Sequence, residues 1–190
     1  MNRIKLFAVI AAMAVCGVAR AQGNSFAKVS YSNVAIKASY MGMSSTQKLD
    51  GVSVGFTQAR ELTDGLPFLC EYGIDLLAAF GDNSTLISAM VPVNLMCRLN
   101  LGQIKLLPFA GLNLTEHIIG QEEYDGVTNN WFKKDKDGDA ACHRFQLGAQ
   151  FGAKILSETY FLGISYQPSL TNFADNTNLN ILNVSIGVAF

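Results

Sequence analysis

The sequence carries little charge and, beyond its first 21 residues, contains no long uncharged apolar run. Charged residues make up 15% of the 190 residues, whereas 49% are hydrophobic. A membrane-spanning helix needs roughly 20 consecutive apolar residues, so the chain beyond residue 21 cannot cross a membrane in that form. Lys and Arg are also not clustered, and a nucleic-acid surface would require such clusters. We therefore expect neither a spanning helix nor a nucleic-acid partner.

The first 21 residues have the pattern of a secretory signal peptide. Arg3 and Lys5 precede an almost wholly apolar stretch at 6–18, and Ala19-Arg20-Ala21 then forms a small-x-small cleavage site. We expect cleavage after Ala21, with residues 1–21 as the signal peptide and residues 22–190 as one domain. Removal of three basic residues leaves 11 basic and 15 acidic residues, a net charge of −4.

Alternation of apolar and polar residues takes the place of a spanning helix. Counting back from Phe190, every second residue as far as Leu182 is large and apolar, and those between are small or polar. A period of two indicates a β-strand with one apolar face. Eight segments show this period, although the first and fifth are ambiguous in phase, and a bulge near residues 32–33 would reconcile the first. They cover 25–38, 52–60, 68–80, 87–99, 104–119, 144–152, 160–167 and 182–190.

Such strands suit either a soluble barrel or a transmembrane barrel that turns its apolar face to lipid. The residues expected to face inward include many polar side chains, and those expected to face outward include many aromatic ones. A soluble barrel would leave these aromatic rings uncovered. We therefore predict an all-β fold, an eight-stranded antiparallel up-and-down transmembrane β-barrel. A soluble lipocalin-like exported ligand binder is the alternative.

The lengths of the connections predict the orientation of this barrel. Short connections fall near 61–66, 81–86, 101–104 and 156–159, whereas those near 41–50, 119–141 and 168–178 are longer or more polar. With the N-terminus in the periplasm, every short connection except 81–86 falls on the periplasmic side. Outer-membrane barrels have short periplasmic turns and longer extracellular loops. We therefore expect an outer-membrane protein of Gram-negative type, with extracellular loops and periplasmic termini.

Several stretches resemble the small eight-stranded outer-membrane β-barrel family, OmpX-like and PorT-like. They are residues 51–56, 91–95, 107–111 and 161–166, followed by the terminal Phe190. The resemblance implies insertion by the barrel assembly machinery, which reads a terminal aromatic strand, so Phe190 would be the assembly signal and outer-membrane lipid a partner. The family has no single activity, so a function does not follow from the fold.

Catalytic and metal-binding patterns are weak. His117 and His143 are the two histidines, and neither has a serine two residues on, as lipid A deacylase barrels do. Nucleophilic catalysis requires a nucleophile, a base and an acid in mutual reach. The acidic residues at 135, 137 and 139 alternate as in a calcium loop, but with the wrong spacing for an EF-hand. We expect no enzyme, no cofactor and no metal site.

Four charged residues are expected inside the barrel: Glu71, Asp75, Arg98 and Arg144. They would form either a structural salt-bridge network that fills the lumen or the lining of a gate or proton path. The network is favoured, because unpaired charge in a narrow lumen is costly. A narrow channel for small solutes or ions remains the alternative function.

A pairing of Phe80 with Ile87 would place Cys70 and Cys97 opposite each other on adjacent strands or one step diagonal. Export permits a disulfide there, but strained geometry between adjacent strands favours free thiols.

The segment 120–140 interrupts the strand pattern and is the best candidate for an interaction loop. It contains aromatic and basic residues of the kinds found at binding hot spots or facing lipid phosphates. They are Tyr124, Trp131, Phe132, Lys133 and Lys134. The loop would contact a surface protein or lipopolysaccharide, or else form a disordered tip. The predicted role is therefore structural, or surface interaction through the extracellular loops.

Overall fold

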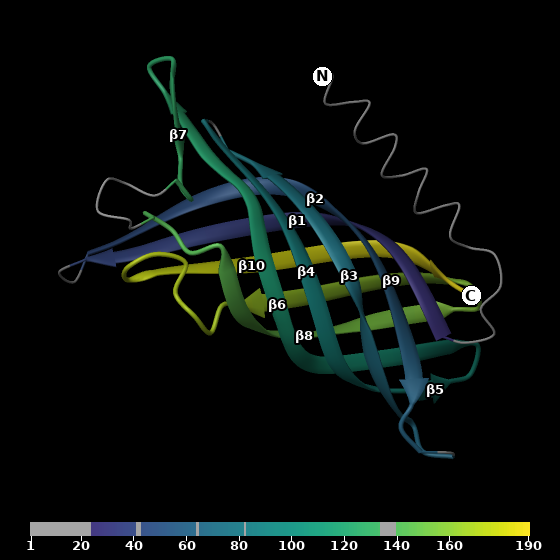
Figure 1. The fold of residues 1–190 in the computed structure, drawn as a ribbon. Helices are drawn as coiled ribbons and strands as arrows, with labels where there is room; N and C mark the ends of the chain where they lie inside the picture. The colour runs from purple at the N-terminus through teal and green to yellow at the C-terminus, as the bar shows by residue number, and fades with distance from the viewer. Residues whose placement is uncertain (1–23, 41–42, 64, 82, 134–139) are drawn as a thin grey trace.

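The structure is a computed structural model that describes residues 24–40, 43–63, 65–81, 83–133 and 140–190 (Figure 1). The expected signal peptide lies outside these residues, as do Lys134 and the acidic residues at 135, 137 and 139. Across the described residues, no helix is long and apolar enough to cross a membrane. The strands are β1 (Asn24–Tyr40), β2 (Met43–Glu61), β3 (Phe68–Phe80), β4 (Ser84–Cys97), β5 (Leu99–Leu101), β6 (Ile104–Tyr124), β7 (Val127–Asn130), β8 (Phe145–Ser157), β9 (Tyr160–Pro168) and β10 (Thr177–Ala189).

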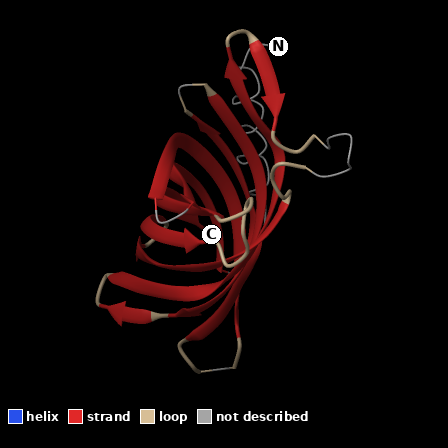
Figure 2. Cartoon of the chain, turned by 90° about the vertical axis from the view of Figure 1, so that its left-hand side faces the viewer, coloured by secondary structure: helices blue, strands red, loops and turns tan. Residues whose placement is uncertain are grey.

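The eight long strands close into a ring. The order is β1-β2-β3-β4-β6-β8-β9-β10, every pair is antiparallel, and β10 pairs with β1 to complete the circle. Figure 2 shows the strands curving around one lumen. The short strands β5 and β7 pair with the first and the last residues of β6, respectively. The predicted eight-stranded antiparallel barrel is therefore confirmed.

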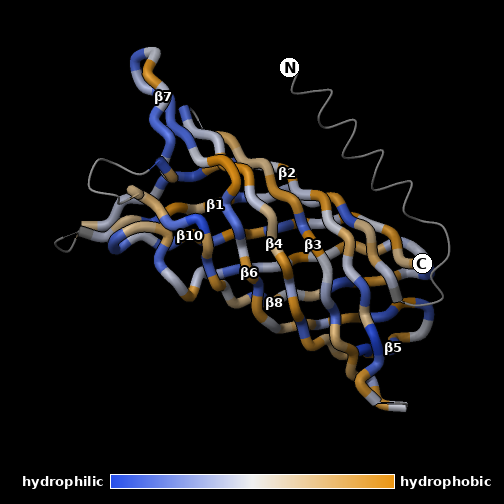
Figure 3. Tube along the Cα trace, viewed as in Figure 1, coloured by the Kyte–Doolittle hydropathy of each residue, from blue (hydrophilic) through white to orange (hydrophobic). Residues whose placement is uncertain are grey.

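Hydrophobic and hydrophilic residues alternate along the strands (Figure 3), and their exposure separates an apolar outer wall from a lumen of mixed polarity. On β3, Tyr72 and Ile74 are exposed on the outer wall while Glu71 and Asp75 are buried inside. On β10, Ile186 is 60% exposed. Large apolar side chains can remain on an outer surface if that surface faces lipid. The predicted outward faces of the third to eighth segments are confirmed, and their apolar character favours the transmembrane barrel over the soluble lipocalin-like alternative.

The predicted register between β3 and β4 is wrong by two residues. Ala78, rather than Phe80, pairs with Ile87, and Cys70 pairs with Leu95. The backbone turns at once after β3, since Gly81 donates a hydrogen bond to the carbonyl of Ser84. Because the turn is two residues shorter than predicted, every pair between β3 and β4 shifts by two residues.

The first strand needs no bulge. Its register with β10 is continuous from Phe26 to Ala38, and residues of even number face inward. Phe26 and Val34 are buried in the lumen, while Tyr31 is 53% exposed on the outer wall. The ambiguous phase arose because the ends of the lumen are apolar, so both faces of β1 carry large apolar residues.

Two segments expected to be loops contain parts of strands. The segment 41–50 belongs mostly to β2, which begins at Met43, and the segment 120–140 contains the end of β6 and all of β7. Their side chains are mostly exposed on both faces. Beyond the lipid-facing band a strand needs backbone pairing but no alternation of hydrophobicity, so its sequence resembles that of a loop.

The chain termini lie at one end of the barrel, where Ser25 and Phe190 exchange two backbone hydrogen bonds of 3.0 Å. The connections 62–67, 102–103 and 158–159 share this end. The opposite end, called the mouth here, carries the β1–β2 and β6–β7 hairpins and the described residues 131–133, 140–144 and 169–176.

Candidate functional site: the lumen and its mouth

Two buried ion pairs cross the lumen near its middle. Lys28 on β1 reaches Asp75 on β3 at 2.7 Å, and Lys154 on β8 reaches Glu71 on β3. Glu71 also accepts hydrogen bonds from Thr57 at 2.6 Å and from the amide of Asn94 at 3.1 Å. All four charged side chains are at least 90% buried. The cost of burying each charge is therefore offset by a close opposite charge.

The predicted lumen network had the right acids and the wrong cations. Arg98 pairs with Glu61 at 3.0 Å at the terminal end, and both are partly exposed. Arg144 is exposed at the mouth, where it donates to the backbone carbonyls of His117 and Ile118 at 3.4 and 3.2 Å. Neither arginine reaches Glu71 or Asp75, because each lies beyond the ends of the polar belt, the middle part of the lumen that contains the two buried ion pairs.

Lys28 and Lys154 were missed, although their phase could have revealed them. Lys154 lies two residues after Gly152, on the inward face of its strand, and Lys28 shares the phase of the buried Ser30 and Ser32. A lysine in the inward phase of a strand indicates a buried charge, which needs an acidic partner across the lumen.

Inward glycines make room for the long polar side chains. A Cβ on Gly55 would overlap the carboxylate of Asp75, and a Cβ on Gly111 would overlap the amide of Asn94. A glycine in a strand commonly marks such a close approach. The small residues of the inward face therefore leave the space that the long side chains of the polar belt occupy.

An apolar cluster closes the lumen at each end. The terminal cluster packs around Lys154, whose ammonium lies 4.3 Å from the ring centroid of Phe26. Its members are Phe26, Ala59, Leu69, Met96, Leu107, Phe109, Leu156 and Phe161. The mouth cluster consists of Val34, Ile36, Leu49, Leu77, Ala79, Leu86, Met90, Phe132, Phe173, Leu179 and Ile181. The polar belt therefore lies between two apolar plugs.

The structure buries some residues of the predicted interaction loop and exposes others. Phe132 is only 5% exposed and belongs to the mouth cluster, and Trp131 packs edge-on to Phe173 with ring centroids 5.9 Å apart. Tyr124 is 75% exposed on the β6–β7 hairpin and Lys133 is exposed. The two aromatic rings turn inward because the open end of the barrel offers them an apolar cover, so they are plug residues rather than surface anchors.

His117 lies beneath this plug in a hydrogen-bonded row. Its Nδ1 lies 2.8 Å from the hydroxyl of Ser88, and its Nε2 lies 2.8 Å from the amide oxygen of Gln146. The ring stacks on Phe132 with ring centroids 6.0 Å apart. Histidine is 0% exposed here, and the third member is a neutral amide, which cannot stabilise an imidazolium as a carboxylate does. The row therefore lacks both substrate access and an activating acid.

The three described cysteines, Cys70, Cys97 and Cys142, are free thiols. Cys70 and Cys97 lie one diagonal step apart, since Cys97 pairs with Phe68. Cys142 packs against the mouth cluster, and burial raises the pKa of its thiol to about 11.

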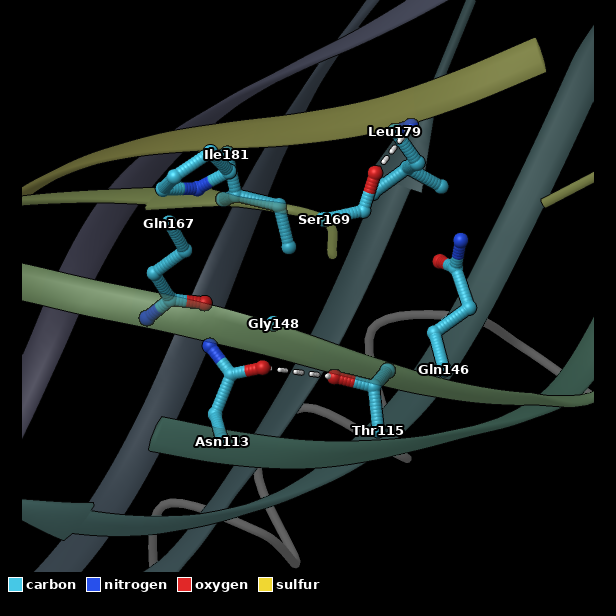
Figure 4. Close-up of a pocket in the computed structure, with 9 residues that line it drawn as sticks. Asn113, Thr115, Gln146, Gly148, Gln167, Ser169, Leu179 and Ile181 are labelled. Carbon is cyan, nitrogen blue, oxygen red and sulfur yellow. Dashed lines mark hydrogen bonds between the residues drawn. The ribbon is translucent and has the colours of Figure 1, made fainter. Parts of the chain in front are cut away.

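A small cavity opens between the polar belt and the mouth (Figure 4). Its volume is about 10 Å³, the size of one water molecule, and Asn113, Thr115 and Gln167 contribute polar groups to it. Thr115 donates to Asn113 at 3.5 Å. The amide oxygen of Gln167 has no hydrogen-bond partner within the described part of the chain. The cavity suits a solvent molecule and is too small for an organic ligand. Among the described residues, no three potential metal ligands lie close together.

Comparisons with known proteins agree with the geometry. No protein-family model matches the sequence, and no curated protein sequence matches it either. Among solved structures, Ail, the attachment invasion locus protein of Yersinia pestis, superposes with a TM-score of 0.53 at 13% identity, covering 90% of this chain and 100% of Ail. The outer membrane enzyme PagL superposes with a TM-score of 0.56 at 12% identity, covering 86% of this chain and 99% of PagL.

The chain has the fold of a small outer-membrane β-barrel. The resemblance to that family is thus confirmed at the level of the fold. The two neighbours differ in role, since one is named for attachment and invasion and the other is an enzyme. The particular role of this chain therefore has to be argued from its own residues.

Proposed function

We propose that this barrel has a structural or surface-interaction role, exerted through the extracellular hairpins and loops at its mouth, and that it is not an enzyme. The observation that carries the proposal is the filled lumen. Two apolar plugs and two cross-lumen ion pairs occupy the interior, so the groups free to meet another molecule lie outside it. The Ser88–His117–Gln146 row supports a non-enzymatic role because it is buried and lacks an acid.

The proposed orientation places the termini in the periplasm and the mouth outside. The connections 102–103 and 158–159 at the terminal end are two residues long, whereas the mouth carries the projecting β1–β2 and β6–β7 hairpins. Outer-membrane barrels show this asymmetry. Phe190 lies on the outer wall, 6.2 Å from Phe56 between ring centroids, where the assembly machinery would read it as a terminal signal.

The β6–β7 hairpin is the best contact surface for a surface protein or lipopolysaccharide. Every described side chain from 122 to 130 is exposed, and Tyr124 presents three quarters of its surface. Exposed tyrosine rings supply large contact area at low entropic cost. The hairpin therefore replaces Trp131 and Phe132 as the proposed centre of interaction.

In-cell photo-crosslinking tests this role, with a photoreactive residue replacing Tyr124. We expect a discrete protein or lipid adduct from position 124. Tyr160, 69% exposed at the terminal end, is the matched control and should not give the same adduct. Identical adducts from both positions, or none from position 124 in a correctly folded barrel, would contradict a surface-interaction role for the hairpin.

A narrow channel is the second candidate, and one observation favours it. Four buried acceptor oxygens in the polar belt lack hydrogen-bond partners within the described residues, namely those of Asp75, Asn94, Gln150 and Gln167. Buried acceptors need donors, and water can supply them. A hydrated belt would conduct only if both apolar plugs opened, so conductance in planar bilayers separates the two functions.

A further inference from the structure

The outer wall formed by β10, β1 and β2 changes abruptly from apolar to polar towards the mouth. The last apolar row contains Val184, Tyr31 and Val52, which pair across the three strands. The next row contains Asn33 and Asp50 beside Leu182. Tyr31 marks the step, since its hydroxyl donates to Asp50 at 2.5 Å from the apolar side. An outer-membrane barrel meets lipid headgroups where its apolar band ends.

Ala35 is the centre of the polar wall above this step. Along β1 it is flanked on the same face by Asn33 and Lys37, and across the strands it pairs with Asn180 on β10 and Lys48 on β2. Directly paired residues bring their Cβ atoms about 5 Å apart. Two ammonium groups and two amides therefore surround a floor made by one methyl group. We call this group of five residues the Ala35 patch.

The two lysines of the patch are available to a ligand. Both side chains are exposed, and neither forms a salt bridge within the described part of the chain. Asp50 is the acid nearest in the register, but its Oδ1 already accepts from Tyr31 and from Asn33, the latter at 2.9 Å. Two lysines and one carboxylate, that of Asp50, leave this part of the wall with a net positive charge, although the charge of the whole chain is −1.

The opposite part of the mouth carries more acidic than basic described side chains, since four exposed acids there outnumber the two exposed cations Lys133 and Arg144. On β6 and the β6–β7 hairpin, Glu116, Glu122, Glu123 and Asp125 are all exposed. An anionic molecule lying against the barrel would be repelled there and attracted to β1 and β2. The charge distribution thus selects one side of the wall.

We propose that the Ala35 patch binds the phosphorylated sugar headgroup of a glycolipid in the outer leaflet. Lys37 and Lys48 would pair with the phosphate, and the amides of Asn33 and Asn180 would hydrogen-bond to sugar hydroxyls over the methyl floor. Lysine serves as a point charge for phosphate. This site rests on the proposed function, in which the mouth faces outward. It assigns the proposed contact with lipid to a defined group of residues.

Native mass spectrometry of the folded full chain in detergent tests the site. The probe is a diphosphorylated, acylated glucosamine disaccharide, titrated beside the same lipid without phosphates. We expect tighter binding of the phosphorylated lipid. Two basic residues near a membrane surface each add about 1 kcal/mol, so Lys37→Ser with Lys48→Ser should weaken binding on the order of tenfold or more.

Arg60→Ser with Lys105→Ser is the matched control, because it removes the same charge from exposed residues at the terminal end. This control should bind the lipid as the unchanged chain does. Ala35→Phe retains both lysines but fills the floor, and it should weaken binding as well. Equal affinity for the phosphorylated and phosphate-free lipids would overturn the proposal, as would equal losses in the lysine pair and its control. Soluble glucosamine phosphate that binds as tightly as the lipid would also overturn it.

The failure of this site can be distinguished from a failure of the proposed function. Labelling of Tyr124→Cys by an impermeant maleimide in intact cells reports whether the mouth faces outward, in a Cys142→Ser background. An outward mouth with no phosphate preference would remove the lipid site and leave the orientation intact. An inward mouth would remove the proposed function and, with it, the outer-leaflet site.

Discussion

The ammonium of Lys154 meets the carboxylate of Glu71 across the lumen, from strands that are not neighbours in the ring. β8 pairs with β6 and β9, whereas β3 pairs with β2 and β4. The contact therefore braces opposite walls rather than adding to one ladder. Glu71→Gln should reduce the free energy of unfolding by on the order of 3–5 kcal/mol, because it leaves a buried ammonium without its counter-charge. Urea unfolding in lipid vesicles, followed by the fluorescence of Trp131, measures the loss.

A double variant distinguishes the stability contributed by the ion pair from the cost of leaving one of its charges unpaired. Glu71→Gln with Lys154→Met removes both charges and should cost less than Glu71→Gln alone. Glu61→Gln breaks the partly exposed pair with Arg98 and should change stability by about 1 kcal/mol or less. If the buried and exposed variants proved equally stable, the cross-lumen brace would be wrong.

Conductance depends on both plugs at once. We expect the unchanged protein to give no steady single-channel steps in planar bilayers. Phe132→Ala alone should stay closed, because Phe161 in the terminal cluster is only 2% exposed and still blocks the lumen. Phe132→Ala with Phe161→Ala should conduct if the polar belt is hydrated.

Phe151→Ala is the control for this experiment, since Phe151 is 49% exposed on the lipid-facing wall. It should leave conductance unchanged. A heat-dependent gel shift confirms that each variant is folded. Steady steps from the unchanged protein would favour the channel over the plugged barrel.

The local periodicity of the sequence predicted the strands of the barrel wall better than the side-chain contacts inside the lumen. The faces of β3 and β10 could be assigned from residues 68–80 and 182–190 because a strand alternates with a fixed period of two. The closed ring followed from eight such strands and from the need to bury every edge. None of this required knowledge of which strand lies opposite which.

Contacts across the lumen depend on register and diameter, which a local pattern does not encode. The pairing of Phe80 with Ile87 failed because the turn after β3 is shorter than expected. The partner of Glu71 lies 83 residues away on the far wall. Phe132 looked like a surface anchor because its segment is polar, yet the closed fold buries it among the apolar side chains of the mouth cluster.

Ser88 should be unreactive towards serine-directed reagents. Its hydroxyl lies 2.8 Å from His117, which superficially resembles an activated nucleophile. Both residues are 0% exposed, and the third member of the row is the neutral Gln146. A fluorophosphonate probe should therefore leave the folded protein unlabelled, as it should Ser88→Ala. Labelling that disappears in Ser88→Ala would show an accessible, activated serine and would contradict the non-enzymatic role.

Cys142 should react slowly with thiol reagents while the mouth plug is in place. Burial raises the pKa of its thiol from 9.0 to about 11, and the thiolate is the reactive form. At pH 8 the thiolate fraction, and with it the rate of maleimide labelling, should be about 100-fold below that of the urea-unfolded chain. The measurement uses a Cys70→Ser, Cys97→Ser background expressed from residue 22, so that Cys142 is the reporter.

The same shift sets the sign of a pH dependence. Below pH 9 the thiol is protonated in both the folded and the unfolded chain, so it does not affect stability. Between pH 9 and about 11 the unfolded chain loses this proton first, so stability should fall across that window. Cys142→Ser removes this contribution and is the control.

Phe132→Ala should speed labelling of Cys142 at pH 8, because it removes apolar cover from the mouth cluster. Labelling of the folded chain as fast as that of the unfolded chain would show that the mouth is open.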